Sequence, residues 1–150
     1  AVLDSIENAE DNISQARDIV SEKSINSQDV VIGLAASGNT PFTCKVLEES
    51  YKKDSLTIAI SNNPNGKILE FGKCKIILNT KEELISGSTR LKAGTAQKIC
   101  LNIISSMVMI KFGRVKNGLM SKMVPTNKKL RKRQKFIRAN IWYKKIFFDI

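Results

Sequence analysis

The sequence predicts an α/β fold built around a parallel sheet. Three short apolar runs, rich in β-branched residues, lie at residues 29–37, 55–61 and 74–80, and segments with helical spacing separate them. Each run is apolar throughout, as in parallel strands that are covered on both faces. Strands that alternate with helices in this way form an α/β sandwich. Because three strands make a small sheet, we expect one bare edge that another chain could cover.

The first helices are predicted from spacing and from end signals. Apolar residues recur with helical spacing over residues 2–20, with a polar break at residues 8–12. Thr40 and Pro41 suit the N-cap and the first position of a helix that runs to about residue 53. Later in the chain, one long apolar helix is expected over residues 88–112 and another from about residue 126.

Composition argues against several classes of function. Histidine is absent, and the three cysteines, Cys44, Cys74 and Cys100, lie far apart. A zinc site or a Ser-His-Asp triad is therefore not expected, and proton transfer falls to a carboxylate, Lys, Tyr or Cys. Scattered thiols indicate a reduced, cytoplasmic protein. No run of about 18 apolar residues occurs, so no membrane span is expected.

The net charge of +11 is concentrated at the C-terminal end. Residues 121–150 contain ten Lys or Arg residues, and Asp149 is their one acidic residue. The mixture of cations with Phe136, Trp142 and Tyr143 is one that could follow a nucleic-acid backbone or an anionic membrane. A solvated helix explains the same pattern. We favour that interpretation and expect no nucleic-acid partner.

Two loops have the residue types of an anion site. Residues 37–40 (Ser-Gly-Asn-Thr) lie after a predicted strand and before a helix, where unpaired N–H groups and the helix dipole favour a phosphate. Ser88 or Thr89 can cap the long helix, Arg90 follows them, and Lys92 lies in its first turn, where a cation opposes the dipole unless an anion is near. Helix capping explains the hydroxyls equally well, and the residues alone leave both interpretations open.

Three stretches in this order, "VVIGLAASGNTPF", "LTIAISNNPNG" and "ISGSTRLKAGTAQKICLNIISSMVMIKFGRV", carry a resemblance to a known family. Together they resemble the N-acetylmuramic acid 6-phosphate etherases, which belong with the glucokinase regulatory protein to the sugar isomerase (SIS) domain superfamily. The third stretch contains the etherase signature, from Leu84 to Lys98. The resemblance runs from about Val2 to Leu130.

The resemblance implies both a fold and an activity. The fold is a parallel-sheet, three-layer sandwich of SIS type, incomplete here at about three strands, with a long buried helix. The activity is that of a cytoplasmic, bacterial carbon–oxygen lyase of amino sugar metabolism and peptidoglycan recycling. It cleaves the lactyl ether of N-acetylmuramic acid 6-phosphate to N-acetylglucosamine 6-phosphate and D-lactate. The resemblance implies no metal or organic cofactor, and it makes a homodimer the expected assembly.

The resemblance also assigns roles to residues. Two carboxylates on a helix, such as Glu7 and Glu10, are usually solvated surface. Glu10, however, matches one of the two acid–base glutamates of the family, and we expect it to remove the C2 proton in an elimination that is followed by hydration. The residues that match ligand-contacting positions are Ser37, Gly38, Asn39, Thr40, Ser88 and Lys92. The hydroxyl-rich start of the long helix is then one wall of a phosphosugar pocket.

The chain departs from the family pattern at several positions, and these departures suggest two regions. The other acid–base glutamate and a Gly-Ser-rich phosphate loop belong to a family segment before the point that matches Ala1, and Asn39 stands where Arg is common. We expect a partial SIS domain at residues 1–127 and a basic-aromatic tail, off the family pattern, at residues 128–150. Little activity is expected from these residues alone. The alternatives are a non-catalytic, sugar-phosphate-binding regulatory domain and an interaction module that works through its tail.

Overall fold

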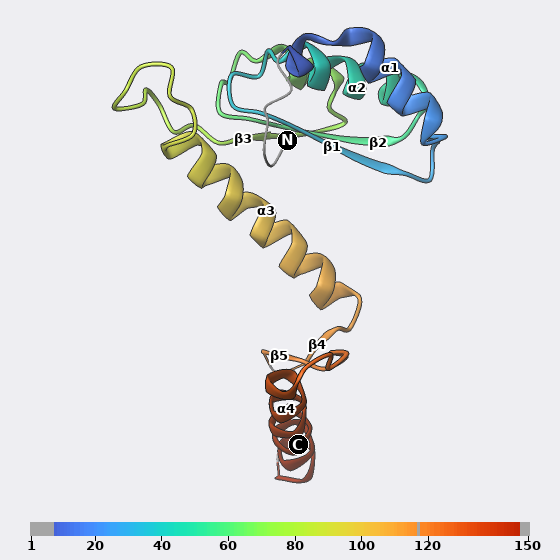
Figure 1. Cartoon of the computed structure of the whole chain (residues 1–150), viewed down its shortest axis with the longest axis vertical. Helices are drawn as coiled ribbons and strands as arrows, with labels where there is room; N and C mark the ends of the chain where they lie inside the picture. Colours follow the sequence, from blue (N-terminus) through green and yellow to red (C-terminus); the bar gives the residue numbers. More distant parts are fainter. Residues whose placement is uncertain (1–7, 117, 148–150) are drawn as a thin grey trace. The chain divides into compact units, whose positions relative to one another are not determined.

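The computed structural model describes residues 8–116 and 118–147, with side chains described to Asn140. The chain forms two compact units, unit 1 (Ala1–Ile99) and unit 2 (Cys100–Ile150), as Figure 1 shows. The first residues of the helix predicted over residues 2–20 lie outside the described part of the chain, as do the side chains of Trp142 and Tyr143.

Unit 1 is built on a parallel sheet of three strands. In sheet order these are β1 (Val30–Ala35), β2 (Leu56–Ser61) and β3 (Cys74–Ile77). The register pairs Val30 with Leu56 and Ile58 with Cys74. Each strand falls within the apolar run that predicted it, and the α/β prediction is confirmed.

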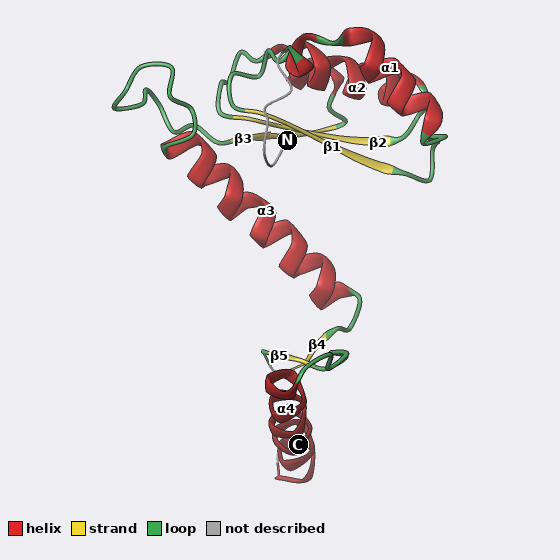
Figure 2. Cartoon of the chain, in the orientation of Figure 1, coloured by secondary structure: helices red, strands yellow, loops and turns green. Residues whose placement is uncertain are grey.

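Helices α1 and α2 cover one face of this sheet (Figure 2). In chain order the helical elements of the sheet region are η1 (Ala9–Asp11), α1 (Ile13–Glu22), α2 (Pro41–Lys52) and η2 (Lys67–Phe71). α1 packs on α2, and α2 packs on β1 and β2. The polar break predicted at residues 8–12 contains the short η1, and α2 begins at Pro41 with Thr40 in the N-cap position, as predicted.

Small residues beneath α2 let the helix lie close to the sheet. Leu47 of α2 is fully buried, and a Cβ atom on Gly33 would lie 2.6 Å from its Cδ1 atom. Ala35 and Ala59, on the same face of the sheet, are also buried. A larger side chain in this layer would push the helix away from the strands, since packed interiors hold few voids that could absorb it.

The opposite face of the sheet is open in the part of the chain that the structure describes. Val30, Ile32 and Leu56 are 56%, 40% and 44% exposed. No described helix packs over this face, so unit 1 shows two of the three layers of the expected sandwich. The outer edges of β1 and β3 carry no further strand within the described residues, which is the incomplete sheet that the strand count predicted.

Helix α3 (Lys92–Lys111) matches the long helix predicted over residues 88–112, but it is not buried as expected. Among its residues Ala93 alone is buried, and Ile99, Ile103 and Met107 are each more than half exposed. The physical reason is that its apolar side chains lie on all sides and the described chain places nothing over them. By length and composition α3 could cross a membrane, although helices from the interior of a larger domain have the same composition.

Unit 2 contains a short hairpin and a second long helix. Its elements after α3 are β4 (Val115–Lys116), β5 (Leu119–Met120) and α4 (Lys128–Phe147). The hairpin was not predicted, although the sequence Asn-Gly at positions 117–118 is a common hairpin turn; Gly118 has a positive φ of 73°. α4 begins close to the predicted residue 126, where Leu130 N–H donates to the side chain of Asn127 (2.9 Å). The expected division into a domain at residues 1–127 and a tail at residues 128–150 stays a prediction. The two compact units of the structure divide between Ile99 and Cys100.

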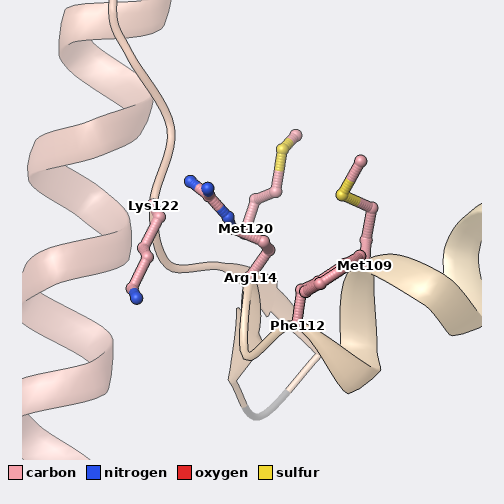
Figure 3. Close-up of a pocket in the computed structure, with 5 residues that line it drawn as sticks. All are labelled: Met109, Phe112, Arg114, Met120 and Lys122. Carbon is pink, nitrogen blue, oxygen red and sulfur yellow. The ribbon is translucent and has the colours of Figure 1, made fainter. Parts of the chain in front are cut away.

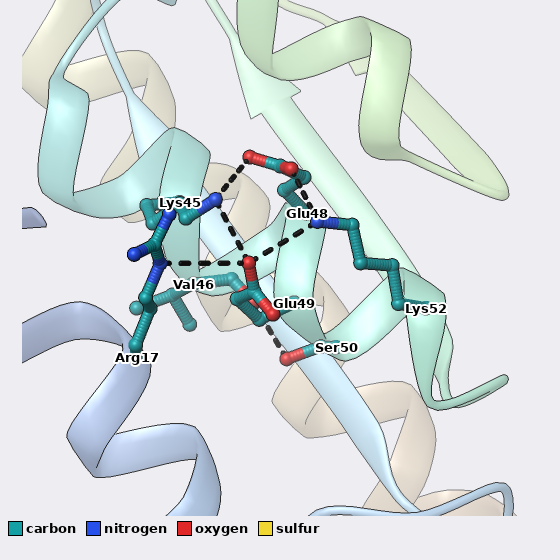
Figure 4. Close-up of polar contacts among 7 residues, drawn as sticks. All are labelled: Arg17, Lys45, Val46, Glu48, Glu49, Ser50 and Lys52. Atoms are coloured by element: carbon teal, nitrogen blue, oxygen red, sulfur yellow. Dashed lines mark hydrogen bonds and ion pairs between the residues drawn. The ribbon is translucent and has the colours of Figure 1, made fainter. Parts of the chain in front are cut away.

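Ion pairs run along the exposed side of α2 (Figure 4). Lys45 Nζ lies 2.9 Å from Glu48 Oε2 and 2.8 Å from Glu49 Oε1, and Lys52 Nζ lies 2.6 Å from Glu48 Oε1. Arg17 of α1 reaches Glu49 at 3.9 Å and so joins the two helices. Hydrogen bonds from Lys52 and Lys45 lower the pKa of Glu48 to about 2. The network therefore stabilises α2 only while its carboxylates are ionised.

Acid should weaken unit 1 partly through Glu48. Its pKa is lower in the folded chain than in the unfolded chain, so its ion pairs contribute fully above its ordinary value and fade as the pH falls towards 2. We expect Glu48→Gln to reduce the acid-induced fall in the free energy of unfolding by about 0.5–1 kcal/mol, in the range of surface ion pairs. Thermal melts by circular dichroism between about pH 5 and about pH 2.5 measure this fall. The control Asp18→Asn, at an exposed position on α1, should leave it unchanged; equal changes in both variants would contradict the assignment.

Candidate functional site

The site is built where β1 and β2 end. β1 leads into residues 36–40, which include the four predicted ligand-loop residues, and β2 leads into residues 62–66. The carboxyl ends of parallel strands lie at the same end of a sheet. Because β1 and β2 are neighbours, the two turns that follow them lie side by side there. Figure 1 shows both turns, and the start of α3, at the same end of the sheet.

The two turns touch through their backbones. Gly38 has a φ of 75°, and a Cβ atom there would lie 2.4 Å from the Cα atom of Gly66 and 2.6 Å from Ser61 Oγ. The reverse holds at Gly66, where a Cβ atom would lie 2.6 Å from the Cα atom of Gly38. Both positions therefore require glycine, Gly38 for its backbone angle and for space, Gly66 for space alone.

Hydrogen bonds fix the turns to each other. Asn63 Nδ2 donates to the carbonyl of Ser37 (3.0 Å), and Ile68 N–H donates to the carbonyl of Gly38 (2.9 Å). Lys67 N–H donates to the side-chain oxygen of Asn39 (3.0 Å). Asn39 thus holds the start of η2, which is a structural use of a residue that the sequence suggested only as a ligand contact.

The start of α2 is open to an anion. Thr40 occupies the N-cap, but its side chain makes no capping hydrogen bond. The N–H groups of Phe42 and Thr43 have no hydrogen-bond partner among the described residues. Ser37 is exposed beside them, and its Oγ atom accepts from Asn39 N–H (3.2 Å). Free N–H groups at a helix start are the usual donors to a phosphate.

The start of α3 is instead closed by a carboxylate of the same chain. Lys92 N–H and Ala93 N–H donate to the two carboxylate oxygens of Glu83, at 3.0 and 2.9 Å. The hydrogen bond from Ala93, together with the bond and the charge of Lys92, lowers the pKa of Glu83. Lys92 Nζ donates to the carbonyl of Glu82. The anion that a cation in this first turn requires is therefore Glu83, a residue that the sequence analysis did not place there.

Asn62, in the turn after β2, forms hydrogen bonds with the loop after β1, the loop after β3 and helix α3. Its backbone N–H donates to the carbonyl of Ala36 (3.2 Å), and its Nδ2 atom donates to the carbonyl of Leu78 (3.0 Å). Its Oδ1 atom accepts from Gln97 Nε2 of α3 (2.9 Å). The backbone and side chain of one residue thus join the loops after all three strands to α3. Ser88 is half-buried in the loop that precedes α3.

Glu10 lies apart from these bonds. It sits on η1, is exposed, and η1 packs against α2. Among the described residues no hydrogen bond or ion pair involves the Glu10 carboxylate, and no hydrogen bond joins Glu10 to Ser37 or Ser88. Hydrogen bonds join the 37–40 loop to residues 62–68, and Asn62 connects these to Gln97 of α3. Within the described residues no hydrogen bond joins the 37–40 loop directly to Ser88 or Lys92, and Glu10 lies near it only through the packing of η1 on α2.

A cavity of about 420 Å³ lies beside the ligand loop. Its lining residues are Ile13, Arg17, Asn39, Pro41, Cys44, Lys45, Glu48, Lys67 and Phe71. Asn39 was predicted as a site residue, whereas the cations Arg17, Lys45 and Lys67 were not. Lys67 directly follows Gly66 and could have been found as the first residue after the "NNPNG" turn. Burial raises the pKa of the Cys44 thiol, which makes Cys44 a packing residue rather than a nucleophile.

Comparison with known proteins decides the family. A model of the SIS domain matches residues 3–107. The chain belongs to the SIS domain family. The solved structure of the Vibrio vulnificus NanR protein complexed with ManNAc-6P matches with a TM-score of 0.56 and 10% identity, covering 87% of this chain and 42% of that chain. That likeness concerns the fold alone, and it confirms the SIS-type fold.

Curated relatives confirm the resemblance to the etherases. The chain is 46% identical over 130 residues to the N-acetylmuramic acid 6-phosphate etherase of Clostridium acetobutylicum. It is 47% identical over 139 residues to that of Clostridium botulinum, and 40% over 134 residues to that of Klebsiella aerogenes. These alignments cover 87%, 93% and 89% of this SIS chain but 43%, 46% and 45% of the relatives. The chain thus spans just under half of the length of the curated relatives it matches.

The contact between the two turns can be tested with a matched pair of glycines. Gly38 and Gly87 have nearly equal φ angles, 75° and 77°, but a Cβ atom on Gly87 would meet no atom within 4 Å. Gly87→Ala should therefore lower the free energy of unfolding by about 1 kcal/mol, the cost of the backbone angle. Gly38→Ala should cost about 2–4 kcal/mol, because it also separates the turns. Urea unfolding measures both, and equal losses would contradict the close approach.

The capping role of Glu83 can be tested in the same way. Glu83→Gln should destabilise the start of α3 by about 1 kcal/mol, because a neutral amide is a weaker acceptor at a helix N-terminus. Faster amide exchange at Ala93 in the variant, measured by NMR, is the expected result. Glu82→Gln is the control, since it is the backbone carbonyl of Glu82 that accepts from Lys92. Unchanged exchange at Ala93 in Glu83→Gln would show that the cap is not formed.

Proposed function

We propose that this chain forms one part of the phosphosugar site of an etherase. The substrate is N-acetylmuramic acid 6-phosphate, and the products are N-acetylglucosamine 6-phosphate and D-lactate, as the names of its relatives suggest. The observation that supports this best is identity of 40–47% to the etherases across the segments that meet at the end of the sheet. The setting is amino sugar metabolism in peptidoglycan recycling in the bacterial cytoplasm.

The open start of α2 is the proposed place for the phosphate. Ser37 and the free N–H groups of Phe42 and Thr43 supply donors, and the 37–40 loop is held rigid by its bonds to residues 62–68. A rigid set of donors binds an anion without a large loss of conformational entropy. Ser88 and Lys92 are proposed to contact the sugar from the other side, since Glu83 already occupies the anion position at α3.

Glu10 is the proposed catalytic base. Its exposed carboxylate can accept the proton on C2, whose bonding electrons then form a double bond as the ether oxygen leaves with D-lactate. Hydration of the double bond gives the second product. The reaction requires a second group that protonates the leaving oxygen, and the family resemblance places that glutamate outside these residues. A homodimer is proposed for the assembly, and no cofactor for the reaction.

Release of D-lactate from N-acetylmuramic acid 6-phosphate tests the proposal. We expect turnover by the 150 residues alone to lie on the order of 10²–10⁴ below that of an intact etherase, the usual effect of losing one proton-transfer group. Glu10→Gln should remove the remaining turnover, and Glu22→Gln on α1 should not. Turnover that does not depend on Glu10 would contradict the assignment.

A second candidate function is that of a non-catalytic regulatory domain that binds a sugar phosphate. Calorimetry with N-acetylglucosamine 6-phosphate, together with the lactate assay, distinguishes it from the etherase. The open helix start of α2, which can bind phosphate without any acid–base group, is the observation that favours it. Binding that is abolished by Gly38→Ala, together with no lactate release even in an assembled dimer, would support a sensor in place of an enzyme.

A further inference from the structure

The two units differ sharply in net charge. Unit 1 contains 12 Lys or Arg residues and 13 Asp or Glu residues, whereas unit 2 contains 13 Lys or Arg residues and a single acidic one, Asp149. A surface that is dense in one sign of charge attracts polyanions over several ångströms. The proposed phosphosugar site in unit 1 makes no use of this charge.

One side of α4 packs against its own unit. Ile137 is 3% exposed, and Leu130 and Gln134 are partly buried. Gln134 Nε2 donates to the carbonyl of Met123 (3.2 Å), and α4 contacts β5. These three residues recur at helical spacing, so they share one side of the helix. This side of α4 is therefore packed over residues 130–137.

Over residues 128–138, cations take up most of the remaining circumference of α4. Seven of them, all exposed, lie between residues 128 and 138: Lys128, Lys129, Arg131, Lys132, Arg133, Lys135 and Arg138. At 100° per residue they cover an arc of about 220°. Arg114 and Lys122 add two cations on the same unit, where they line a cavity of about 610 Å³ with Met109, Phe112 and Met120 (Figure 3).

We propose that this cationic arc of α4 binds the phosphate backbone of duplex nucleic acid without sequence preference. An α-helix about 10–12 Å across fits a major groove about 12 Å wide, with phosphates along both walls. Cations over an arc of about 220° face both walls at once. An anionic membrane would contact one side of the helix only, whereas these cations face several directions at once. Of the described apolar residues of α4, Leu130 and Ile137 pack within unit 2 and Phe136 is exposed among the cations. The sequence alone favoured a solvated helix because it could not show which side of α4 is packed.

Fluorescence anisotropy of the full chain with a labelled 20-base-pair DNA duplex tests the proposal. The logarithm of the association constant should fall with the logarithm of the salt concentration, with a slope of about −3 to −6 for the phosphates that seven cations can neutralise. The triple variant Arg131→Gln, Lys132→Gln, Lys135→Gln keeps helix-forming residues and should flatten the slope by about 2–3. Affinity at about 50 mM salt should fall about 10–100-fold.

A matched triple variant in unit 1 controls for net charge. Lys53→Gln, Lys75→Gln, Lys98→Gln removes three exposed cations and should leave the slope unchanged. Equal weakening by both triple variants, or no binding at low salt, would overturn the proposal. So would tighter binding to vesicles of phosphatidylcholine and phosphatidylserine than to the duplex, since that result assigns the surface to a membrane. Circular dichroism of each variant shows that α4 is still formed.

Discussion

The close approach of Gly38 and Gly66 is the contact on which the rest of unit 1 depends. Two turns that end neighbouring strands can meet at backbone distance only if neither carries a Cβ atom there. Once they meet, the carbonyl of Gly38 accepts from Ile68 N–H and the side chain of Asn39 accepts from Lys67 N–H. The direction in which the chain enters α2 and the place where η2 begins follow from this single steric condition.

The same condition explains why the two helix starts differ. The start of α2 follows directly from a turn that is held by backbone bonds, so it needs no side-chain cap and keeps free N–H groups. The start of α3 follows a longer loop, whose backbone bonds next to the helix stay within residues 85–95. Glu83 caps it from ten residues before Ala93, and thereby fixes the loop itself. The start of α2 can therefore accept a ligand, because hydrogen bonds between the turns already hold it in place. The start of α3 is occupied by the carboxylate of Glu83, which stabilises the helix and the loop before it.

Local patterns in the sequence were enough to predict the strands, α2 and the approximate extent of α3 and α4, because apolar periodicity and end signals act over a few residues. The long-range hydrogen bonds that hold the site's loops together could not be predicted from such local patterns. Asn62 joins Ala36 to Gln97, and such bonds across dozens of residues leave no spacing to detect. The burial of α3 was expected from the family resemblance, and neither the resemblance nor the apolar composition shows what covers the helix. The roles of Glu10 and Ser37 came from resemblance and stay predictions.

The two units place different demands on the chain. The proposed phosphosugar site needs donors fixed to within a fraction of an ångström, and unit 1, with nearly balanced charge, holds its turns with many backbone bonds. A phosphate-backbone surface needs charge density more than geometry, and α4 provides it with one packed side and exposed cations elsewhere. Ligand binding in unit 1 should therefore respond to single changes such as the loss of Gly38, whereas polyanion binding in unit 2 should weaken gradually with each cation removed and with salt. Because the two responses differ in kind, either function can fail in an experiment without affecting the evidence for the other.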